Sequence, residues 1–323
     1  MTESLKMKIP TFKEVQKAYL KIREKVHRTP VLSSQKVNDR AGGELFFKCE
    51  NFQKVGAFKF RGATHAIGNL ADEDARNGVA THSSGNHAQA VALAAKQRGI
   101  AAHIVMPENA PKVKVNAVRD YGANVTFSKS TQESREATLN EVIQETGATF
   151  IHPYDNPDII MGQGSAAIEL LEDQPNLDII LVPIGGGGLI SGTAIAASGF
   201  APDTNVIGTE PEVANDAYLS FKTGERHPVQ STDTVADGLR TSLSDLTFNC
   251  IQKHVDDVVT VTEDEIIDAM QFIWERMKII IEPSSAVPLA AVFNGNVDVE
   301  NKKAGIIISG GNMDLNTLPW QEN

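Results

Sequence analysis

The sequence has little cysteine, a deficit of cations and no long apolar run, and each shortage excludes a class of protein. Its only cysteines, Cys49 and Cys250, are too few for a disulfide framework or a zinc cluster, so we expect two reduced, buried thiols in a cytoplasmic protein. The formal net charge is −11, which argues against a nucleic acid partner because phosphate contacts need clustered cations. No stretch reaches the roughly 18 apolar residues that span a membrane, and residues 1–15 show no signal-peptide pattern.

What the 323 residues do contain is an alternation of short apolar segments with amphipathic ones. Capping boxes, Thr11 with Glu14 and Thr262 with Glu265, mark two helix starts. Continuous apolar strands between helices predict an α/β fold, with mostly parallel sheets in two lobes that interrupt one another in sequence. The predicted strands are 44–50, 78–84, 101–107, 123–128, 149–154, 177–184, 205–211, 256–261 and 304–311, and the predicted helices are 11–26, 86–99, 111–122, 131–147, 162–174, 189–199, 262–278 and 284–294.

Four consecutive glycines, Gly185 to Gly188, lie between a predicted strand and a predicted helix. Backbone N–H groups of such a loop, together with the helix N-terminus, favour a phosphate. The dinucleotide spacing G-x-G-x-x-G does not fit, and the P-loop pattern fails because no Lys follows Gly192. The alternative is a tight turn with no ligand, but four glycines exceed what a turn needs.

Two further polar loops follow predicted apolar strands, at 83–87 and at 309–312. Each alone is a weak signal, because Ser, Gly and Asn are ordinary turn residues. The carboxyl ends of parallel strands are where α/β sheets bind ligands, so we expect these loops to share one crevice with the glycine loop.

Lys59 is flanked by two aromatic side chains, Phe58 and Phe60, in the sequence "GAFKFRGA". Desolvation between them would lower the pKa of the lysine and expose a nucleophilic amine. A snorkelling lysine or a buried ion pair explains the octapeptide equally well. A lysine nucleophile and a phosphate cradle in one crevice, however, are what pyridoxal phosphate needs.

These motifs occur in a characteristic order: "GAFKFRGA" at 56–63, "SSGNHAQA" at 83–90, "GGGG" at 185–188, "EP" at 282–283 and "SGGN" at 309–312. In this order they closely resemble fold-type II pyridoxal phosphate enzymes of the serine/threonine dehydratase and serine racemase group. The resemblance covers nearly the whole chain. It implies the tryptophan synthase β-like fold, with a large domain from residues 1–53 plus 155–323, a small mobile domain from 54–154, and a homodimer.

The resemblance also implies a role for each matching residue. Lys59 corresponds to the Schiff-base lysine, and a hydroxyl at Ser84 would supply a second acid/base on the opposite face of the substrate. The alternative is that Ser84 is an ordinary small residue in a turn, with no role in catalysis. Arg135 matches an arginine that approaches the substrate, although a solvated helix face also explains it. The implied cofactor ligands are Phe58, Lys59, Asn86, Gly185, Gly186, Gly187, Gly188 and Ser309, and the implied substrate ligands are Ser83, Ser84, Gly85, His87 and Arg135.

A divalent cation site is implied by "TEPEVANDAY", where Glu210, Asp216 and the carbonyl group of Ala214 match ligands of Mg²⁺, Ca²⁺ or Mn²⁺ in the racemases. Oxygen ligands suit these ions, but spacing alone would indicate solvated acids. Tyr154 stands where microbial relatives have Tyr and mammalian racemases have Asn. The ATP site of mammalian racemases is only partly matched, by Ser33, Ser34, Gln53 and Lys54.

The activity that the resemblance implies is dehydration of a β-hydroxy amino acid (serine, threonine or 3-hydroxyaspartate) to a 2-oxo acid and ammonia. Lys59 would take the α-proton before the β-hydroxyl departs. Serine racemase is the alternative within the class, and a non-catalytic phosphate-binding protein is the alternative outside it. No regulatory domain is expected after residue 312, so feedback inhibition of the isoleucine-pathway kind is not expected.

Overall fold

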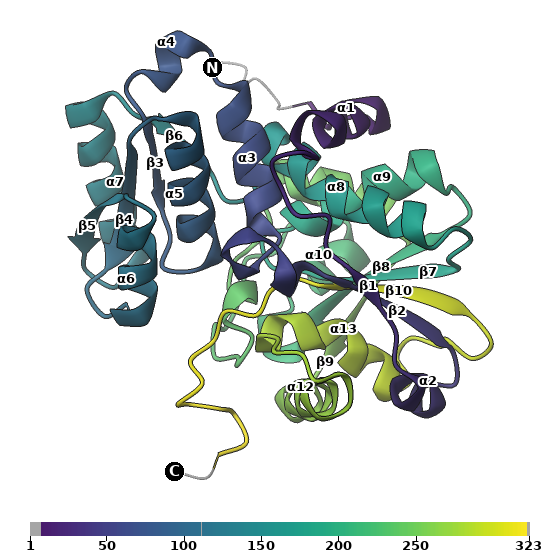
Figure 1. The fold of residues 1–323 in the computed structure, drawn as a ribbon. Coiled ribbons are helices and arrows are strands. Elements are labelled where there is room, and N and C mark those ends of the chain that lie inside the picture. The colour runs from purple at the N-terminus through teal and green to yellow at the C-terminus, as the bar shows by residue number, and fades with distance from the viewer. Residues whose placement is uncertain (1–7, 111, 322–323) are drawn as a thin grey trace.

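The computed structural model describes residues 8–110 and 112–321, which form two α/β lobes, each built on its own sheet (Figure 1). The larger sheet has the order β1-β2-β10-β7-β8-β9, in which β1 pairs antiparallel with β2 and the other neighbours are parallel. Its strands are β1 (Val31–Leu32), β2 (Glu44–Cys49), β7 (Ile179–Pro183), β8 (Asn205–Pro211), β9 (Asp257–Val261) and β10 (Lys303–Ile308).

The smaller sheet is wholly parallel and has the order β5-β4-β3-β6. Helices cover both faces of both sheets: α8 and α9 lie opposite α12 and α13, and α5 lies opposite α7 (Figure 1). The strands are β3 (Val79–His82), β4 (Ala102–Pro107), β5 (Asn124–Ser128) and β6 (Thr149–Phe150), and the helices are α1 (Phe12–Ile22), α2 (Gln35–Ala41), α3 (Lys59–Asn69), α4 (Asp72–Ala75), α5 (Asn86–Arg98), α6 (Lys112–Asp120), α7 (Gln132–Thr146), α8 (Pro157–Asp173), α9 (Gly188–Phe200), α10 (Asp216–Thr223), α11 (Asp245–His254), α12 (Glu263–Met277) and α13 (Pro283–Phe293).

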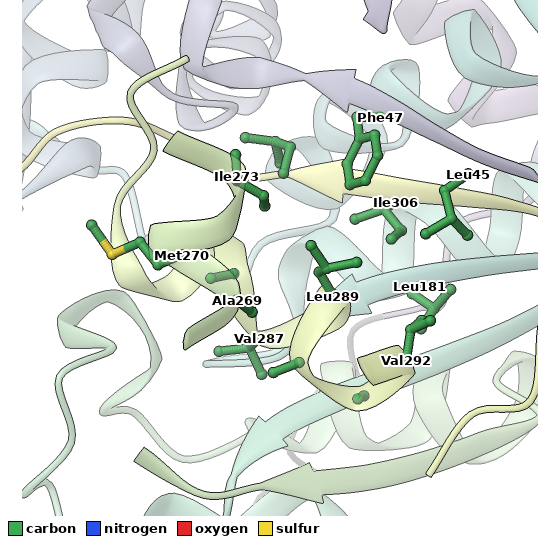
Figure 2. Close-up of a cluster of buried hydrophobic side chains, with 14 of the residues drawn as sticks. Leu45, Phe47, Leu181, Ala269, Met270, Ile273, Val287, Leu289, Val292 and Ile306 are labelled. Atoms are coloured by element: carbon green, nitrogen blue, oxygen red, sulfur yellow. The ribbon is translucent and has the colours of Figure 1, made fainter. Parts of the chain in front are cut away.

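Buried aliphatic side chains hold the larger lobe together. Figure 2 shows one such cluster, in which Leu45 and Phe47 of β2 and Ile306 of β10 face Leu289 of α13, with Ala269, Met270 and Ile273 of α12 to one side. Beyond β10 the chain returns to this cluster, because Trp320 meets Trp274 of α12 edge to face at 5.4 Å between ring centroids. The removal of this apolar surface from water is the main stabilising term of the lobe.

The α/β class and the parallel sheets are confirmed, and each predicted strand overlaps an observed one, although β10 starts at Lys303, one residue before the predicted 304. The strand predicted at 149–154 was too long: β6 ends at Phe150, because the next residues turn about Pro153, which has no N–H group to donate to the sheet. α8 starts five residues before the predicted 162, because Asn156 caps its first N–H groups. The sequence did not predict β1, α2, α3, α4, α10 or α11.

Other expectations from the sequence meet the structure in different ways. Cys49 and Cys250 are buried free thiols, as expected, and burial raises the pKa of both. No described helix is long and apolar enough to cross a membrane. The signal-peptide prediction falls partly on residues 1–7, and the predicted helix start at Pro111 also lies outside the described residues. The domain boundaries stay predictions, although α3 packs against α5 of one lobe and α8 of the other.

Candidate active site

A cavity of about 1020 Å³ opens where the carboxyl ends of strands from both sheets face each other. The loops after β3, β7 and β10 all line it, as expected from parallel strands. The predicted cation ligands are absent from its walls. The predicted residues that line the cavity are Phe58, Lys59, Ser83, Ser84, Gly85, Asn86, His87, Arg135, Gly185, Gly186, Gly187, Gly188 and Ser309.

Lys59 is the first residue of α3 and is half-buried in the cavity wall. Its Nζ donates a hydrogen bond to the carbonyl oxygen of Pro153 at 3.0 Å and lies 5.1 Å from the centre of the Phe58 ring. Desolvation lowers the pKa of Lys59 to about 8, although the carboxyl group of Glu282 works in the opposite direction. About a tenth of this amine is therefore unprotonated near pH 7, far more than for a lysine with an ordinary pKa.

The glycine loop has no room for side chains. A Cβ on Gly186 would lie 2.2 Å from the Tyr154 ring, and one on Gly185 would lie 2.8 Å from the carbonyl oxygen of Gly238. Gly187 adopts a φ of +84°, which only glycine takes without strain. No side chain caps the following helix α9, so its first N–H groups remain for an anion.

Glu282 organises part of the cavity wall, although the sequence pattern predicted no role for it. Both of its carboxylate oxygens accept from Nδ2 of Asn86 at 3.0 Å, while Nδ2 of Asn312 donates to Oδ1 of Asn86 at 2.9 Å. Burial, with Asp237 nearby, raises the pKa of Glu282 to about 7. The only signal for it was the "EP" dipeptide. The hydroxyl group of Ser309, which also lines the cavity, is 3.0 Å from that of Ser285.

Two histidines in the cavity wall are held neutral. Nε2 of His87 donates to the carbonyl oxygen of Ile151 at 2.9 Å, which leaves Nδ1 as a buried acceptor without a partner. Burial and the neighbouring Lys59 lower the pKa of His87 to about 3. His152, which the sequence analysis did not single out, has its pKa lowered to about 4 by burial, and its Nδ1 accepts from the N–H group of Asp155.

Cations gather locally in this acidic chain. Arg135 is half-buried in the cavity wall, where one guanidinium nitrogen donates to Gln132 at 2.8 Å. Its Nε is buried and has no hydrogen-bond partner within residues 8–110 and 112–321. Lys114, which the sequence analysis missed, pairs with Asp237 at 2.9 Å and so joins the two lobes beside the cavity. Ser84 lies in the same wall. The cavity thus presents cations suited to an anionic ligand.

The predicted cation ligands lie in the larger lobe, outside the cavity. The oxygens of Glu210 accept from the N–H groups of Ala217 and Tyr218, and Oδ2 of Asp216 accepts from Leu243 at 3.1 Å. Among the residues that the structure describes, none is a hydrogen-bond partner of the buried Oδ1 of Asp216. Burial raises the pKa of Asp216 to about 7, and burial together with Asp216 raises that of Glu210 well above its usual value.

Ala214 is also buried, next to these carboxylates in sequence. Within residues 8–110 and 112–321 no three His, Cys, Asp or Glu side chains form a metal cluster, so a site here would depend on the backbone carbonyl group.

None of the residues suggested for ATP lines the cavity. Gln53 exchanges two hydrogen bonds with the backbone of His27, and Nζ of Lys54 donates to the carbonyl oxygen of Lys25 at 2.6 Å. Ser34 precedes α2 as its N-cap residue, next to Ser33. The side chains of Gln53 and Lys54 are therefore engaged within the chain, and nucleotide binding stays a prediction.

A desolvated lysine, a loop of glycines at a helix N-terminus and neutral hydrogen-bonding partners in one cavity are features that a pyridoxal phosphate site needs. The family model "Pyridoxal-phosphate dependent enzyme" matches residues 22–310, and the chain belongs to this family.

Three proteins are similar to this chain over nearly its whole length. The beta-hydroxyaspartate dehydratase of Paracoccus denitrificans is 48% identical over 314 residues, which cover 97% of this chain and 100% of that protein. The serine racemase of Dictyostelium discoideum is 49% identical, over 95% of this chain and 96% of its own length. The structure of maize serine racemase superimposes with a TM-score of 0.94 at 48% identity and covers 96% of both chains.

Proposed function

We propose that this chain is an ammonia-lyase that dehydrates β-hydroxy amino acids, 3-hydroxyaspartate foremost, to a 2-oxo acid and ammonia. The observation that carries the proposal is the unpaired Nε of Arg135 in the cavity that also holds Lys59 and the glycine loop. Two similar proteins support it: the Paracoccus denitrificans dehydratase and the L-threo-3-hydroxyaspartate ammonia-lyase of Saccharomyces cerevisiae, which is 46% identical.

The residues of the cavity fit pyridoxal phosphate. The loop from Gly185 to Gly188 would hold the phosphate, and Ser309 would meet the pyridine nitrogen. Asn86 would bind the 3-hydroxyl group, since Glu282 and Asn312 already fix its amide. Phe58 would pack beside the ring. When bound, the cofactor withdraws electrons from the substrate Cα and acidifies the α-proton.

Lys59 would move that proton. Its pKa of about 8 leaves enough neutral amine near pH 7 to accept a proton, and the carbonyl oxygen of Pro153 would orient the side chain. A serine at position 309 carries no charge with which to keep the pyridine nitrogen protonated. We therefore favour prompt elimination of the β-hydroxyl group over transamination.

The walls of the cavity would orient the substrate. The loop of Ser83, Ser84 and Gly85 precedes the N-terminus of α5, where backbone N–H groups suit the α-carboxylate, with His87 at its first turn. Arg135 would pair with a second carboxylate, which 3-hydroxyaspartate has and serine lacks.

Serine racemisation is the second candidate activity, and Ser84 favours it. Its hydroxyl group lines the same cavity as Lys59 and would return a proton to the opposite face of Cα. The similarity to serine racemases of Dictyostelium discoideum and maize supports this activity beside the elimination.

Three finer proposals accompany the reaction. Glu210, Asp216 and the carbonyl group of Ala214 would bind a divalent cation, because Asp216 has a buried oxygen without a partner beside a second carboxylate. A homodimer would cover exposed apolar side chains such as Phe52. Free buried thiols are consistent with a cytoplasmic location.

Purified enzyme should be incubated with L-serine, L-threonine and both 3-hydroxyaspartate diastereomers, while 2-oxo acid and D-serine are measured. We expect the highest kcat/KM for one hydroxyaspartate diastereomer. Arg135→Met should raise the KM for that substrate about tenfold or more and leave the KM for serine within threefold, because only the former has a second carboxylate. Equal effects on both substrates would contradict the role of Arg135, and a protein without the 410–420 nm cofactor band would be a non-catalytic binder.

Ser84→Ala separates the two activities. It should abolish D-serine formation and largely spare 2-oxo acid formation, because only racemisation needs the second proton donor. D-serine formation at the wild-type rate would reduce Ser84 to a turn residue.

A further inference from the structure

Two residues after Lys59, Arg61 enters a cluster of four charged side chains that are all 0–1% exposed: Lys48, Glu50, Arg61 and Glu169. The Arg61 guanidinium group contacts Glu50 through Nε and Nη2, at 2.7 and 2.8 Å. It also contacts Glu169 through Nη1 and Nη2, at 2.8 and 2.7 Å. Nζ of Lys48 donates to Glu169 at 2.7 Å, so two cations balance two carboxylates.

This cluster joins α3 to two elements of the larger lobe. Glu50 directly follows β2, and Glu169 lies on α8. The two helices also touch through glycine, since a Cβ on Gly162 would lie 2.7 Å from the carbonyl oxygen of Arg61. The first turn of α3 has no side-chain cap, because Phe58 occupies the N-cap position without a capping hydrogen bond. The Arg61 contacts therefore fix a turn that is otherwise uncapped.

Stability alone is a poor explanation for such a cluster. Desolvation of buried ions offsets most of their attraction, and apolar replacements of whole clusters are often neutral or stabilising. What a planar guanidinium group with two bidentate partners supplies is a fixed orientation. That orientation is imposed on the helical turn that begins with Lys59.

We propose that Arg61 is a positioning residue, which holds the first turn of α3 so that Nζ of Lys59 meets the carbonyl oxygen of Pro153 at the cavity wall. The proposal rests on Lys59 being the cofactor-binding lysine of the proposed function. Its role is geometric, because burial and Glu282 set the lowered pKa of Lys59, with no part for the cluster. The glycine loop connects β7 to α9, and the hydrogen-bond partners of Arg61 lie on other segments, so phosphate binding should not depend on Arg61.

The test compares Arg61→Met with wild type in two assays on cofactor-free protein. The first is the affinity for pyridoxine 5′-phosphate, which has the ring and the phosphate but no aldehyde to react with Lys59. The second is the fraction of pyridoxal 5′-phosphate that borohydride traps on Lys59, located by peptide mass spectrometry. We expect R61M to bind pyridoxine 5′-phosphate within threefold of wild type and to trap at least tenfold less pyridoxal phosphate.

Arg28→Met is the matched control. Arg28 also pairs with two carboxylates of α8, Glu172 at 2.7 Å and Asp173 at 2.5 Å, and its side chain is 47% exposed. R28M should therefore trap the wild-type amount. If R61M does not fold, Arg61→Lys takes its place, because a single ammonium group retains the charge without the planar fork. We expect R61K to trap at least threefold less pyridoxal phosphate than wild type.

Wild-type trapping in R61M, or in R61K where that variant replaces it, would overturn the positioning role alone. Equal losses of pyridoxine 5′-phosphate affinity and of trapping would also overturn it, because they would indicate collapse of the whole site. Labelling of wild-type protein at a different lysine would overturn the proposed function together with the role of Arg61.

Discussion

The molecule buries two pairs of carboxylates and treats them differently. Glu50 and Glu169 surround Arg61, and although burial acts to raise the pKa of Glu169, the contacts of Arg61 lower it below its usual value. In the described part of the chain, the carboxylates of Glu210 and Asp216 accept from backbone N–H groups alone, and burial raises the pKa of both. One pair is neutralised by the chain itself, and the other is not.

The difference distinguishes a charge-balanced buried cluster, which needs no ligand, from a site whose carboxylates need a proton or a bound cation. A cluster with balanced charge can serve as part of the frame, as at Lys48 and Arg61. A buried carboxylate with an unpartnered oxygen, as in Asp216, stores unfavourable energy that a proton or a cation relieves. Each of the following predictions tests this difference between the two pairs of carboxylates.

The largest effect is expected where the balanced pair loses a cation. Lys48→Met leaves two buried carboxylates with Arg61 alone and should lower the free energy of unfolding by about 3–5 kcal/mol. Urea unfolding followed by circular dichroism measures it. A loss below about 1 kcal/mol would show that this charged cluster does not hold α3 to the larger lobe.

The next effect is a pH dependence of the unbalanced pair in EDTA. The pKa of Asp216 is 3.8 without its folded surroundings and about 7 within them. Between these values the native state binds more protons than the unfolded state, so the free energy of unfolding falls as the pH rises, on the order of 3 kcal/mol across this window. Asp216→Asn should remove much of that slope. A wild-type curve no steeper than that of D216N would contradict the raised pKa.

A divalent cation should offset the destabilisation that the ionised carboxylates of Glu210 and Asp216 cause. At a concentration one hundred times its dissociation constant, Mg²⁺ or Ca²⁺ would add about 2.7 kcal/mol to the unfolding free energy of wild type. D216N should show no such gain, because it has lost a charged ligand. Thermal unfolding with and without the cation tests this, and equal melting temperatures in wild type would remove the cation from the proposal.

The smallest effect is expected at Arg28, an exposed arginine that pairs with two carboxylates of α8. Arg28→Met removes an ion pair with Glu172 and Asp173 that water already screens, so its cost should be about 0–1 kcal/mol. A loss as large as that of K48M would mean that burial does not explain the difference between the two arginine clusters.

The sequence predicted those features of the site that are local. Lys59 between two aromatics and the run from Gly185 to Gly188 are visible in a few consecutive letters, and both line the cavity. The alternation of strands and helices likewise predicted the class of fold, since apolar periodicity follows directly from burial. Helix α3 was missed because its apolar pattern is interrupted by Arg61 and His65, which are buried through partners distant in sequence.

The rest could not be predicted because it depends on contacts between distant segments. Glu282 meets Asn86 across 196 positions, and Arg61 meets Glu169 across 108. Nothing near a buried glutamate in the sequence distinguishes it from a solvated one. Lys114 was missed for the same reason, since its partner Asp237 is 123 positions away.

The edge-to-face contact of Trp274 and Trp320 makes the chain its own optical probe. These are the only two tryptophans in the sequence, and one belongs to the segment after β10 while the other belongs to α12. Intrinsic tryptophan emission therefore reports on the docking of the C-terminal segment, whereas circular dichroism reports on all the helices. Superimposable unfolding curves from the two signals would establish that this segment detaches only when the lobe itself unfolds.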